Sequence, residues 1–545
     1  MKGLMQDWPL LVHTVLDHAS RWHGEREIVS RSPEGSLHRY SYRDLDARAR
    51  CLASGAGRRL GIKEGDVIAT MAWNTHRHLE IWYGIMGLGA VVHTLNPRLF
   101  HDQLDYIINH AGDRWIFFDT TFLPIIEALA PRLKSVEGFV IMTERAHMPE
   151  TRLANVLCYE DLIAQGTPDL VWPKLDENTA CGMCYTSGTT GNPKGVLYSH
   201  RSLVLHTLGF SIADAFGLAQ RDVVLTIVPM FHANAWGLPF AAGMLGCSVV
   251  LPGPHLVPKD LVDLIESERV TFVGGVPTIV GALYQYLKQS GRTVPTLRQI
   301  LVGGSALPRV LLEGFDEMGI EVVHAWGMTE LSPAGSVSRL RSDMEGWSQE
   351  EKTRVRLLQG TPFPLVELRV VTDDESVAPW DGETAGELEA RGPWVVREYY
   401  DDTGSTDRFH DGWFRTGDVA SIDNRGYVRL VDRTKDMVKS GGEWISSVDL
   451  ENVIMGHPQV AEAAVVAIAH PKWTERPLAC VVPRAGGAGE LTREALRDWL
   501  RGRVADWWLP DDVVVIDVVP KTSVGKFDKK VLRARFKDHA WPETS

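Results

Sequence analysis

The stretch YTSGTTGNPKG, residues 185–195, combines three glycines, four threonine or serine hydroxyls and one lysine within eleven residues. Glycines let backbone N–H groups approach an anion closely, hydroxyls donate hydrogen bonds, and Lys194 adds a mobile positive charge. The stretch therefore predicts a phosphate-binding loop, although an ordinary surface turn can have the same composition. It is not a Walker loop, because Lys194 follows Pro193 and precedes Gly195 instead of preceding Ser or Thr.

The segments around this loop alternate between strand-like and helix-like patterns. Apolar runs that end at Gly, Pro or polar residues occupy residues 67–74, 115–122, 138–144, 223–230, 270–278, 299–308 and 321–330. Amphipathic stretches such as residues 277–291 and 309–319 separate several of them. This rhythm predicts an α/β fold with layered, mainly parallel sheets, in which ligands bind at the carboxyl ends of the strands.

The pattern changes toward the C-terminus. Residues 364–391 read as short strands with acidic turns, which predicts a small β-rich subdomain. We therefore expect a large N-terminal domain over residues 1–431 and a small α+β domain over residues 432–545, with Asp432 at the boundary.

Composition excludes several classes of protein. The chain has 545 residues and a formal net charge of -13, which argues against binding to nucleic acid or to anionic membranes. No run is long and apolar enough to predict a membrane span, and the N-terminus reads as an amphipathic helix instead of a signal peptide. Six scattered cysteines fit a reducing compartment, so a cytoplasmic location is expected.

One cysteine pair invites a different interpretation. Cys181 and Cys184 form a CxxC motif that could indicate zinc or redox chemistry. No second CxxC or CxxH pair completes a tetrahedral site, and the motif lies in an apolar run. Buried strand cysteines are the favoured interpretation.

Six further segments rich in glycine and polar residues follow the first loop. They are VPMFHANAW (residues 228–236), GGSALP (303–308), HAWGMTE (324–330), FRTGD (414–418), DRTKDMVKSGGEWIS (432–446) and PKTSVGKFDKK (520–530). In this order they resemble the motifs of the adenylate-forming enzymes: acyl-CoA synthetases, firefly luciferase and the adenylation domains of nonribosomal peptide synthetases. The resemblance extends over nearly the whole chain.

The resemblance implies an ATP site. Glu330 would bind Mg²⁺, which accepts one or two carboxylates together with phosphate oxygens and water. Asp418 would accept hydrogen bonds from both ribose hydroxyls, and Trp326 would stack on adenine. The other residues implied in nucleotide binding are Thr186, Ser187, Gly188, Thr189, Thr190, Lys194, Gly303, Gly304, Ser305, Ala325, Gly327, Thr329, Arg433 and Lys435.

His232 and Trp236, spaced as if one helical turn apart, are the most ambiguous pair. Such a pair is more often part of a core than of a catalytic site. The resemblance extends through residues 229–240, however, and implies that the segment borders an acyl tunnel that Trp236 closes as a gate.

The C-terminal motifs imply a division of labour. Lys526 matches the family's catalytic lysine, which would bridge the attacking carboxylate and the α-phosphate. Lys529 and Lys530 are expected to be solvated surface charges. Asp432 would be the hinge about which the small domain turns between two half-reactions. The loop implied in the second half-reaction comprises Lys439, Gly441, Gly442 and Trp444.

The implied function is that of an AMP-forming acyl-CoA synthetase. A carboxylate attacks the α-phosphate of ATP to give acyl-AMP and pyrophosphate, and the thiol of coenzyme A then displaces AMP. The chain ends shortly after Lys526, which favours a stand-alone ligase over a peptide-synthetase module. Alternatives are a kinase, disfavoured by the failed Walker register, and a non-catalytic nucleotide sensor, disfavoured by the presence of Lys526, Glu330 and Asp418.

The identity of the acid depends on features that motifs do not encode. The segments at residues 235–245 and 275–284 offer no charge to pair with a second polar group on the acid. Medium- and long-chain fatty acids are therefore expected, with 3-(methylthio)propanoate as the alternative. The segments at residues 72–81 and 93–99 are expected near the nucleotide or coenzyme A mouth, and a homodimer is expected by analogy.

Overall fold

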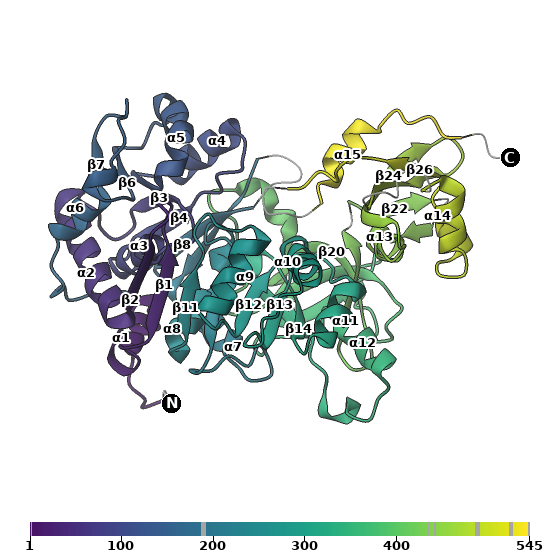
Figure 1. Cartoon of the computed structure of the whole chain (residues 1–545), viewed down its shortest axis with the longest axis horizontal. Helices are drawn as coiled ribbons and strands as arrows, with labels where there is room; N and C mark the ends of the chain where they lie inside the picture. The colour runs from purple at the N-terminus through teal and green to yellow at the C-terminus, as the bar shows by residue number, and fades with distance from the viewer. Residues whose placement is uncertain are drawn as a thin grey trace.

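The computed structural model describes residues 1, 3–186, 192–433, 435–440, 443–484, 491–522 and 527–542. The predicted fold class is confirmed: a large layered α/β domain carries a β-rich subdomain and a small α+β domain at its end (Figure 1). The α-helices are α1 (Val12–Trp22), α2 (Tyr42–Arg59), α3 (His76–Gly87), α4 (His101–Ala111), α5 (Leu123–Leu129), α6 (Tyr159–Ala164), α7 (His200–Phe210), α8 (Leu238–Leu245), α9 (Pro258–Ser267), α10 (Pro277–Ser290), α11 (Arg309–Glu317), α12 (Gln349–Leu357), α13 (Ser447–Met455), α14 (Arg493–Leu500) and α15 (Lys529–Arg535).

The first large sheet has nine strands, and its central strands are parallel. Its order is β16 (Thr361–Pro362), β15 (Ala334–Val337), β14 (Glu321–Gly327), β13 (Gln299–Val302), β12 (Phe272–Gly275), β10 (Val223–Thr226), β11 (Ser248–Leu251), β1 (Glu27–Arg31) and β2 (Leu37–Ser41). Strands β14 to β1 run parallel, whereas β15, β16 and β2 are antiparallel at the edges.

The second large sheet has seven strands. Its order is β7 (Val156–Cys158), β6 (Gly138–Ile141), β5 (Trp115–Phe118), β3 (Val67–Met71), β4 (Val91–Thr94), β8 (Ala180–Tyr185) and β9 (Gly195–Ser199), and only β9 is antiparallel. Cys181 and Cys184 are buried in β8, as expected for core cysteines.

Helix α3 connects the two large sheets. Every one of its residues is buried, because it contacts β4 and β8 of one sheet and β1 of the other. A helix that is apolar or buried all round is typical of the interior of a large domain. The carboxyl ends of the parallel strands in both sheets consequently meet around one central region, which positions the site described below.

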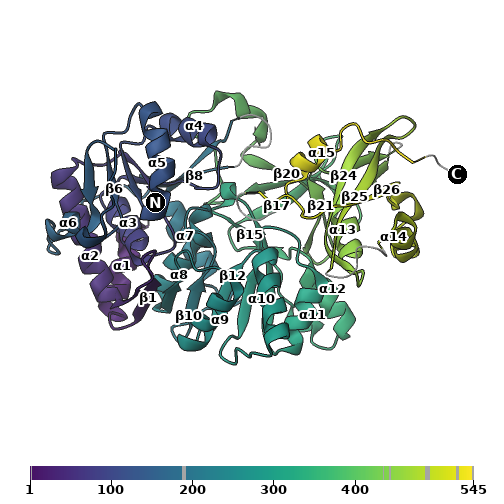
Figure 2. The ribbon, with the colours of Figure 1, turned by 45° about the horizontal axis from the view of Figure 1, so that its top comes forward.

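Two smaller sheets complete the chain. The β-rich subdomain contains β17 (Glu367–Val371), β18 (Gly386–Arg391), β19 (Phe409–His410), β20 (Trp413–Ile422) and β21 (Val428–Arg433). The C-terminal sheet contains β22 (Val438–Ser440), β23 (Glu443–Ile445), β24 (Val460–His470), β25 (Thr474–Pro483) and β26 (Asp512–Val515). Figure 2 shows the small domain at one end of the molecule, next to β20 and β21. The predicted boundary at residues 431/432 falls inside β21.

Among the described residues, no helix combines the length and the apolar character needed to cross a membrane.

Candidate active site

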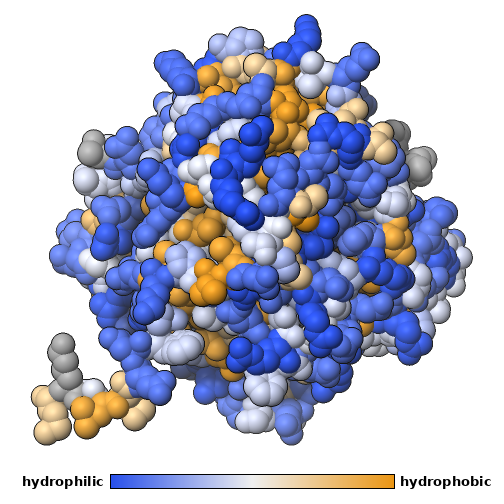
Figure 3. Space-filling model, turned by 90° about the vertical axis from the view of Figure 1, so that its left-hand side faces the viewer, coloured by the Kyte–Doolittle hydropathy of each residue, from blue (hydrophilic) through white to orange (hydrophobic). Residues whose placement is uncertain are grey.

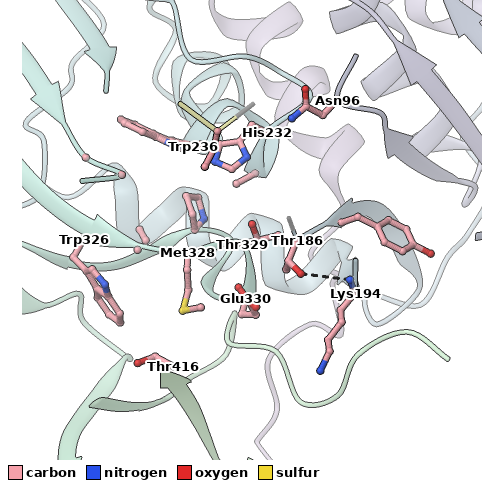
Figure 4. A pocket seen from close by; sticks show the side chains of 18 of the residues that line it. Asn96, Thr186, Lys194, His232, Trp236, Trp326, Met328, Thr329, Glu330 and Thr416 are labelled. Atoms are coloured by element: carbon pink, nitrogen blue, oxygen red, sulfur yellow. Dashed lines mark hydrogen bonds between the residues drawn. The ribbon is translucent and has the colours of Figure 1, made fainter. Parts of the chain in front are cut away.

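A cavity of about 330 Å³ lies where the two large sheets, the β-rich subdomain and the small domain meet. Figure 4 shows Thr186 and Lys194 on one side of it, Trp326 on the other, and His232 with Trp236 across from Glu330. The predicted site residues that line it are Thr186, Lys194, His232, Trp236, Gly303, Gly304, Ala325, Trp326, Gly327, Thr329, Glu330, Arg433 and Lys435. Motifs separated by up to about 250 residues in the sequence are thus brought together.

Lys194 lines the cavity and is held there by contacts of both its backbone and its side chain. The Lys194 backbone N–H donates to Thr186 Oγ1 at 3.4 Å (Figure 4). Its ammonium lies 5.0 Å from the centre of the Tyr399 ring, 3.6 Å from Asp402 Oδ2 and within hydrogen-bond reach of Ser405 Oγ. The aromatic ring and the carboxylate keep the cation beside the cavity.

Glu330 is a buried carboxylate in the cavity wall. It belongs to a 3₁₀ turn, Thr329–Leu331, and is 6% exposed. Tyr399 Oη donates to Glu330 Oε1 at 2.8 Å. Burial raises the pKa of Glu330, and the Tyr399 hydrogen bond opposes that rise.

Asp418 is positioned by the β-rich subdomain. Gly417 adopts a φ of +75°, and a Cβ there would lie 3.0 Å from Arg408 Nη1. Asp418 accepts a hydrogen bond from Trp326 Nε1 at 2.8 Å and pairs with Arg433 Nε at 3.0 Å. The Asp418 carboxylate therefore joins the Trp326 indole of β14 to Arg433 at the end of β21. The backbones of Asp418 and Arg433 are also paired in register between β20 and β21.

The segment that carries His232 and Trp236 is not the right-handed helical turn that the spacing suggests. Residues Ala233, Asn234, Ala235 and Trp236 have φ between +42° and +57°, and Gly237 has +77°. Each non-glycine residue in this region costs on the order of 1–2 kcal/mol, so the turn requires support from its surroundings. The helical interpretation was wrong because strained backbone leaves no periodic signal in the sequence.

Aromatic side chains close the cavity on the Trp236 side. Phe210 and Phe216 line it with ring centres 4.0 Å apart, and both are at most 2% exposed. Phe363 stands behind Phe216 at 5.7 Å, and His206 stands beside Phe210 at 5.7 Å. Burial lowers the pKa of His206 to about 3, so its neutral Nε2 accepts from the Ala334 N–H at 3.3 Å. This end of the cavity is apolar and uncharged.

The start of the small domain is tied to its own core. Asp432 lies within β21, is 4% exposed and accepts hydrogen bonds from the backbone N–H and the hydroxyl of Ser447 at the start of α13. Lys529 is not a solvated surface charge: it is 8% exposed, pairs with Glu451 at 2.7 Å and donates to Ser447 Oγ at 2.6 Å. The expectation for Lys529 failed because the sequence does not reveal that Glu451 and Asp432, on other elements, lie near its ammonium. Lys530 is exposed as expected.

Several predicted residues do not line the cavity or cannot be placed. Asp418 is buried and is not among the described lining residues, although its partners Trp326 and Arg433 are. Ser305 is exposed outside the described lining, and Lys439 is paired in register with Trp444 in the C-terminal sheet. Ser187, Gly188, Thr189, Thr190, Gly441, Gly442 and Lys526 lie outside the described residues. Thr522 and Phe527, which precede and follow residues 523–526, both line the cavity.

Sequence reasoning missed other lining residues. Tyr399 and Arg408 line the cavity but come from segments without a distinctive pattern, whereas Thr416 belongs to the FRTGD motif, in which only Asp418 was singled out. Asn96 belongs to the segment at residues 93–99 that was expected near the mouth, and both Asn96 and Leu99 line the cavity. The companion segment at residues 72–81 is instead largely buried between the two sheets, and it contributes no described lining residue.

Comparisons with known proteins agree with this arrangement. A long-chain-fatty-acid–CoA ligase of Thermus thermophilus is 47% identical over 537 residues, which cover 98% of this chain and 97% of the relative. A 3-methylmercaptopropionyl-CoA ligase of Ruegeria pomeroyi is 46% identical over 540 residues and 99% of both chains. The crystal structure of the anthranilate CoA ligase AuaEII in complex with anthranoyl-AMP has the same fold, with a TM-score of 0.86 at 24% identity over 97% of this chain and 99% of that chain.

Family models agree with these relatives. Residues 16–400 match the AMP-binding enzyme family, and residues 449–526 match the AMP-binding enzyme C-terminal domain. Because the first match alone spans well over half of the chain, this protein belongs to the AMP-binding enzyme family.

Proposed function

We propose that the protein is an AMP-forming acyl-CoA synthetase, which converts a carboxylic acid, ATP and coenzyme A into acyl-CoA, AMP and pyrophosphate through an acyl adenylate. The observation that carries the proposal is that residues of the 185–195 loop, the Glu330 turn and the Trp326 strand line one and the same cavity. Relatives named as acid–CoA ligases at 46–47% identity over nearly the full chain support it.

The large domain would bind ATP. Thr186 and Lys194 would hold the phosphates that depart as pyrophosphate, because preorganised donors stabilise leaving-group charge. Asp418 would accept the ribose hydroxyls beside Trp326, where adenine would stack. The donor set at Glu330 fits Mg²⁺, since this buried carboxylate lines the cavity and one carboxylate suffices when phosphate oxygens supply further ligands. The ion would neutralise phosphate charge.

The small domain would act in both half-reactions. Lys526 would place its ammonium between the acid and the α-phosphate; Thr522 and Phe527 in the cavity wall support an approach of this segment. After adenylation, the domain would turn about Asp432 and bring in the loop with Lys439, Gly441, Gly442 and Trp444. Adenylation and thioester formation need different side chains at the same opening of the cavity, and a domain that turns between the two steps can supply both sets.

The acid would be apolar, in keeping with the uncharged wall of Phe210, Phe216 and Trp236. Medium- or long-chain fatty acids are the first candidate. The cavity volume is near the lower end for ligand sites and must also hold AMP, which favours short acids. Aromatic rings also contact thioether sulfur favourably. These two observations support 3-(methylthio)propanoate as the second candidate.

Assembly and location are further parts of the proposal. The N-terminal segment projects from the body at the lower left of Figure 3 and carries the exposed side chains of Leu4, Met5 and Trp8. Burial of such side chains against a second copy would favour a homodimer. A cytoplasmic location accords with six free cysteines, five of them buried.

Product analysis tests the proposed reaction. With ATP and a fatty acid alone, the protein should release pyrophosphate and form acyl-AMP, and added coenzyme A should convert the latter into acyl-CoA and AMP. Release of ADP would indicate a kinase instead. ATP binding without turnover of any acid from C2 to C18, or of 3-(methylthio)propanoate, would indicate a nucleotide sensor.

A further inference from the structure

Asn74 lies at the junction of the two large sheets. It follows β3 of the seven-stranded sheet, directly precedes the Thr75 N-cap of α3, and is 4% exposed. Its side chain faces the loop that leaves β10 of the nine-stranded sheet and leads to His232.

Both N–H donors of the Asn74 side chain, and one of the two lone pairs of its oxygen, form hydrogen bonds with this loop. Nδ2 donates to the backbone oxygens of Thr226 at 2.8 Å and Val228 at 2.7 Å. Oδ1 accepts from the backbone N–H of Met230 at 2.7 Å. One buried amide thus fixes three alternate backbone groups over residues 226–230.

The loop continues directly into the cavity wall. Phe231, His232, Ala233 and Trp236 all line the cavity, and the turn beginning at Ala233 has the left-handed backbone described above. Strained backbone persists only where neighbouring contacts over-determine it. Thr94 adds a weaker contact, because its hydroxyl donates to Phe231 O at 3.3 Å.

We propose that Asn74 is a positioning residue for the acyl end of the site: it holds the loop at residues 226–232 from the opposite sheet and so keeps His232 and Trp236 in place against the acid. The inference rests on the proposed function for its kinetic readout. Asn74 itself is not among the described lining residues, so it acts through the loop and not by touching substrate.

The chain offers a matched control in Asn109. Its Nδ2 donates to the backbone oxygens of Asp105 at 2.9 Å and Arg132 at 3.2 Å, and its Oδ1 accepts from the Lys134 N–H at 2.8 Å. Asn109 therefore joins its own helix α4, which carries Asp105, to the loop at residues 132–134 with bonds of the same kind, at a less buried position than Asn74. None of these four residues is among the described lining residues.

The experiment compares Asn74→Ala and Asn109→Ala in the full-length protein. Pyrophosphate release gives KM for the acid and for ATP, and hydrogen exchange gives the protection of amides 226–232. For Asn74→Ala we expect an acid KM raised about tenfold or more, an ATP KM within about twofold of wild type, and amide exchange faster by a similar factor. Asn109→Ala should leave both KM values and the exchange of amides 226–232 at their wild-type values. Asn74→Asp should resemble Asn74→Ala, because a carboxylate cannot donate to the two carbonyls.

The outcomes separate the two proposals. Wild-type acid KM and wild-type exchange in Asn74→Ala overturn the inference, and so does an equal rise of both KM values. If the wild-type protein releases no pyrophosphate, the proposed function fails and the exchange measurement alone decides whether Asn74 positions the loop. If Asn74→Ala does not fold, Asn74→Ser is measured in its place. The serine hydroxyl has one donor and cannot serve both the Thr226 and the Val228 oxygens, so a rise of about threefold in acid KM and in exchange is expected; unchanged values overturn the inference.

Discussion

Phe216→Ala should lengthen the acid that the enzyme prefers. Phe216 lines the cavity, is 1% exposed, and lies 4.0 Å from Phe210 between ring centres. Phe363 supports it from behind at 5.7 Å. Replacing the phenyl ring by a methyl group enlarges the cavity at this apolar wall while Phe363 stays in place, so a longer acyl chain that reaches this wall would gain space.

The magnitude follows from the apolar volume exchanged. Replacing the benzyl side chain of phenylalanine by the methyl of alanine removes six carbon atoms. Because an acyl chain cannot fill all of the space they leave, we expect room for about three additional methylenes. Each buried methylene contributes about 0.8 kcal/mol, or about fourfold in kcat/KM. Acids about three carbons longer than the wild-type optimum should therefore improve by about 60-fold relative to wild type. The truncation should also cost about 3–5 kcal/mol of folding free energy.

The assay is acyl-CoA formation with saturated acids from C2 to C18 and with 3-(methylthio)propanoate, at a temperature where circular dichroism shows folded protein. Phe315→Ala is the matched control, because Phe315 is fully buried in another core cluster and is not among the described lining residues. An optimum that stays at the same chain length in Phe216→Ala as in Phe315→Ala would refute the assignment of Phe216 to the end wall.

Four further predictions concern the small domain and the assembly. Lys526→Ala should slow acyl-adenylate formation by about 100-fold or more while CoA transfer from supplied acyl-AMP is largely retained, and equal losses in the two half-reactions would contradict this division. Asp432→Ala should slow thioester formation about tenfold more than adenylation in rapid-quench measurements, because the Ser447 N–H loses its acceptor; wild-type rates in both steps would remove Asp432 from the hinge role. Lys529→Met should lower the free energy of unfolding in urea by about 3–5 kcal/mol, with part of the loss recovered by adding Glu451→Leu, and an unchanged single variant would argue against the buried pair. Light scattering at micromolar concentration should give about twice the mass of one chain, and a mass near 60.6 kDa would exclude the dimer.

Local patterns predicted much of the architecture. The seven apolar runs form β3, β5, β6, β10, β12, β13 and β14, and the amphipathic stretches form α10 and α11. These elements are predictable because strand and helix burial impose short periods on the sequence. The gathering of motif residues around one cavity was also predictable, since glycines and polar side chains at strand ends carry a chemical signature.

Features that depend on distant partners were not predictable. Lys529 looks like a surface residue until Glu451 and Ser447, about 80 residues earlier, are placed beside it. Asn74 lies in the segment at residues 72–81, which was expected near the mouth of the site. Its bonds to the loop at residues 226–230 were not predictable, because that loop is more than 150 residues away in the sequence. The left-handed turn after His232 likewise reflects tertiary support that no local pattern encodes.

The order of strands has a consequence for biosynthesis. Strands β1 and β2 belong to the nine-stranded sheet, yet the chain then builds the whole seven-stranded sheet before it returns with β10 and β11. Ile28 of β1 pairs with Val249 of β11, so at about 5–20 residues per second a ribosome needs about 10–40 s to supply the partner strand. During that interval the hairpin β1–β2 has no neighbour on its inner edge, and an unpaired strand edge can pair with another nascent chain. The N-terminal hairpin is therefore exposed to misassembly during synthesis until β11 has been made.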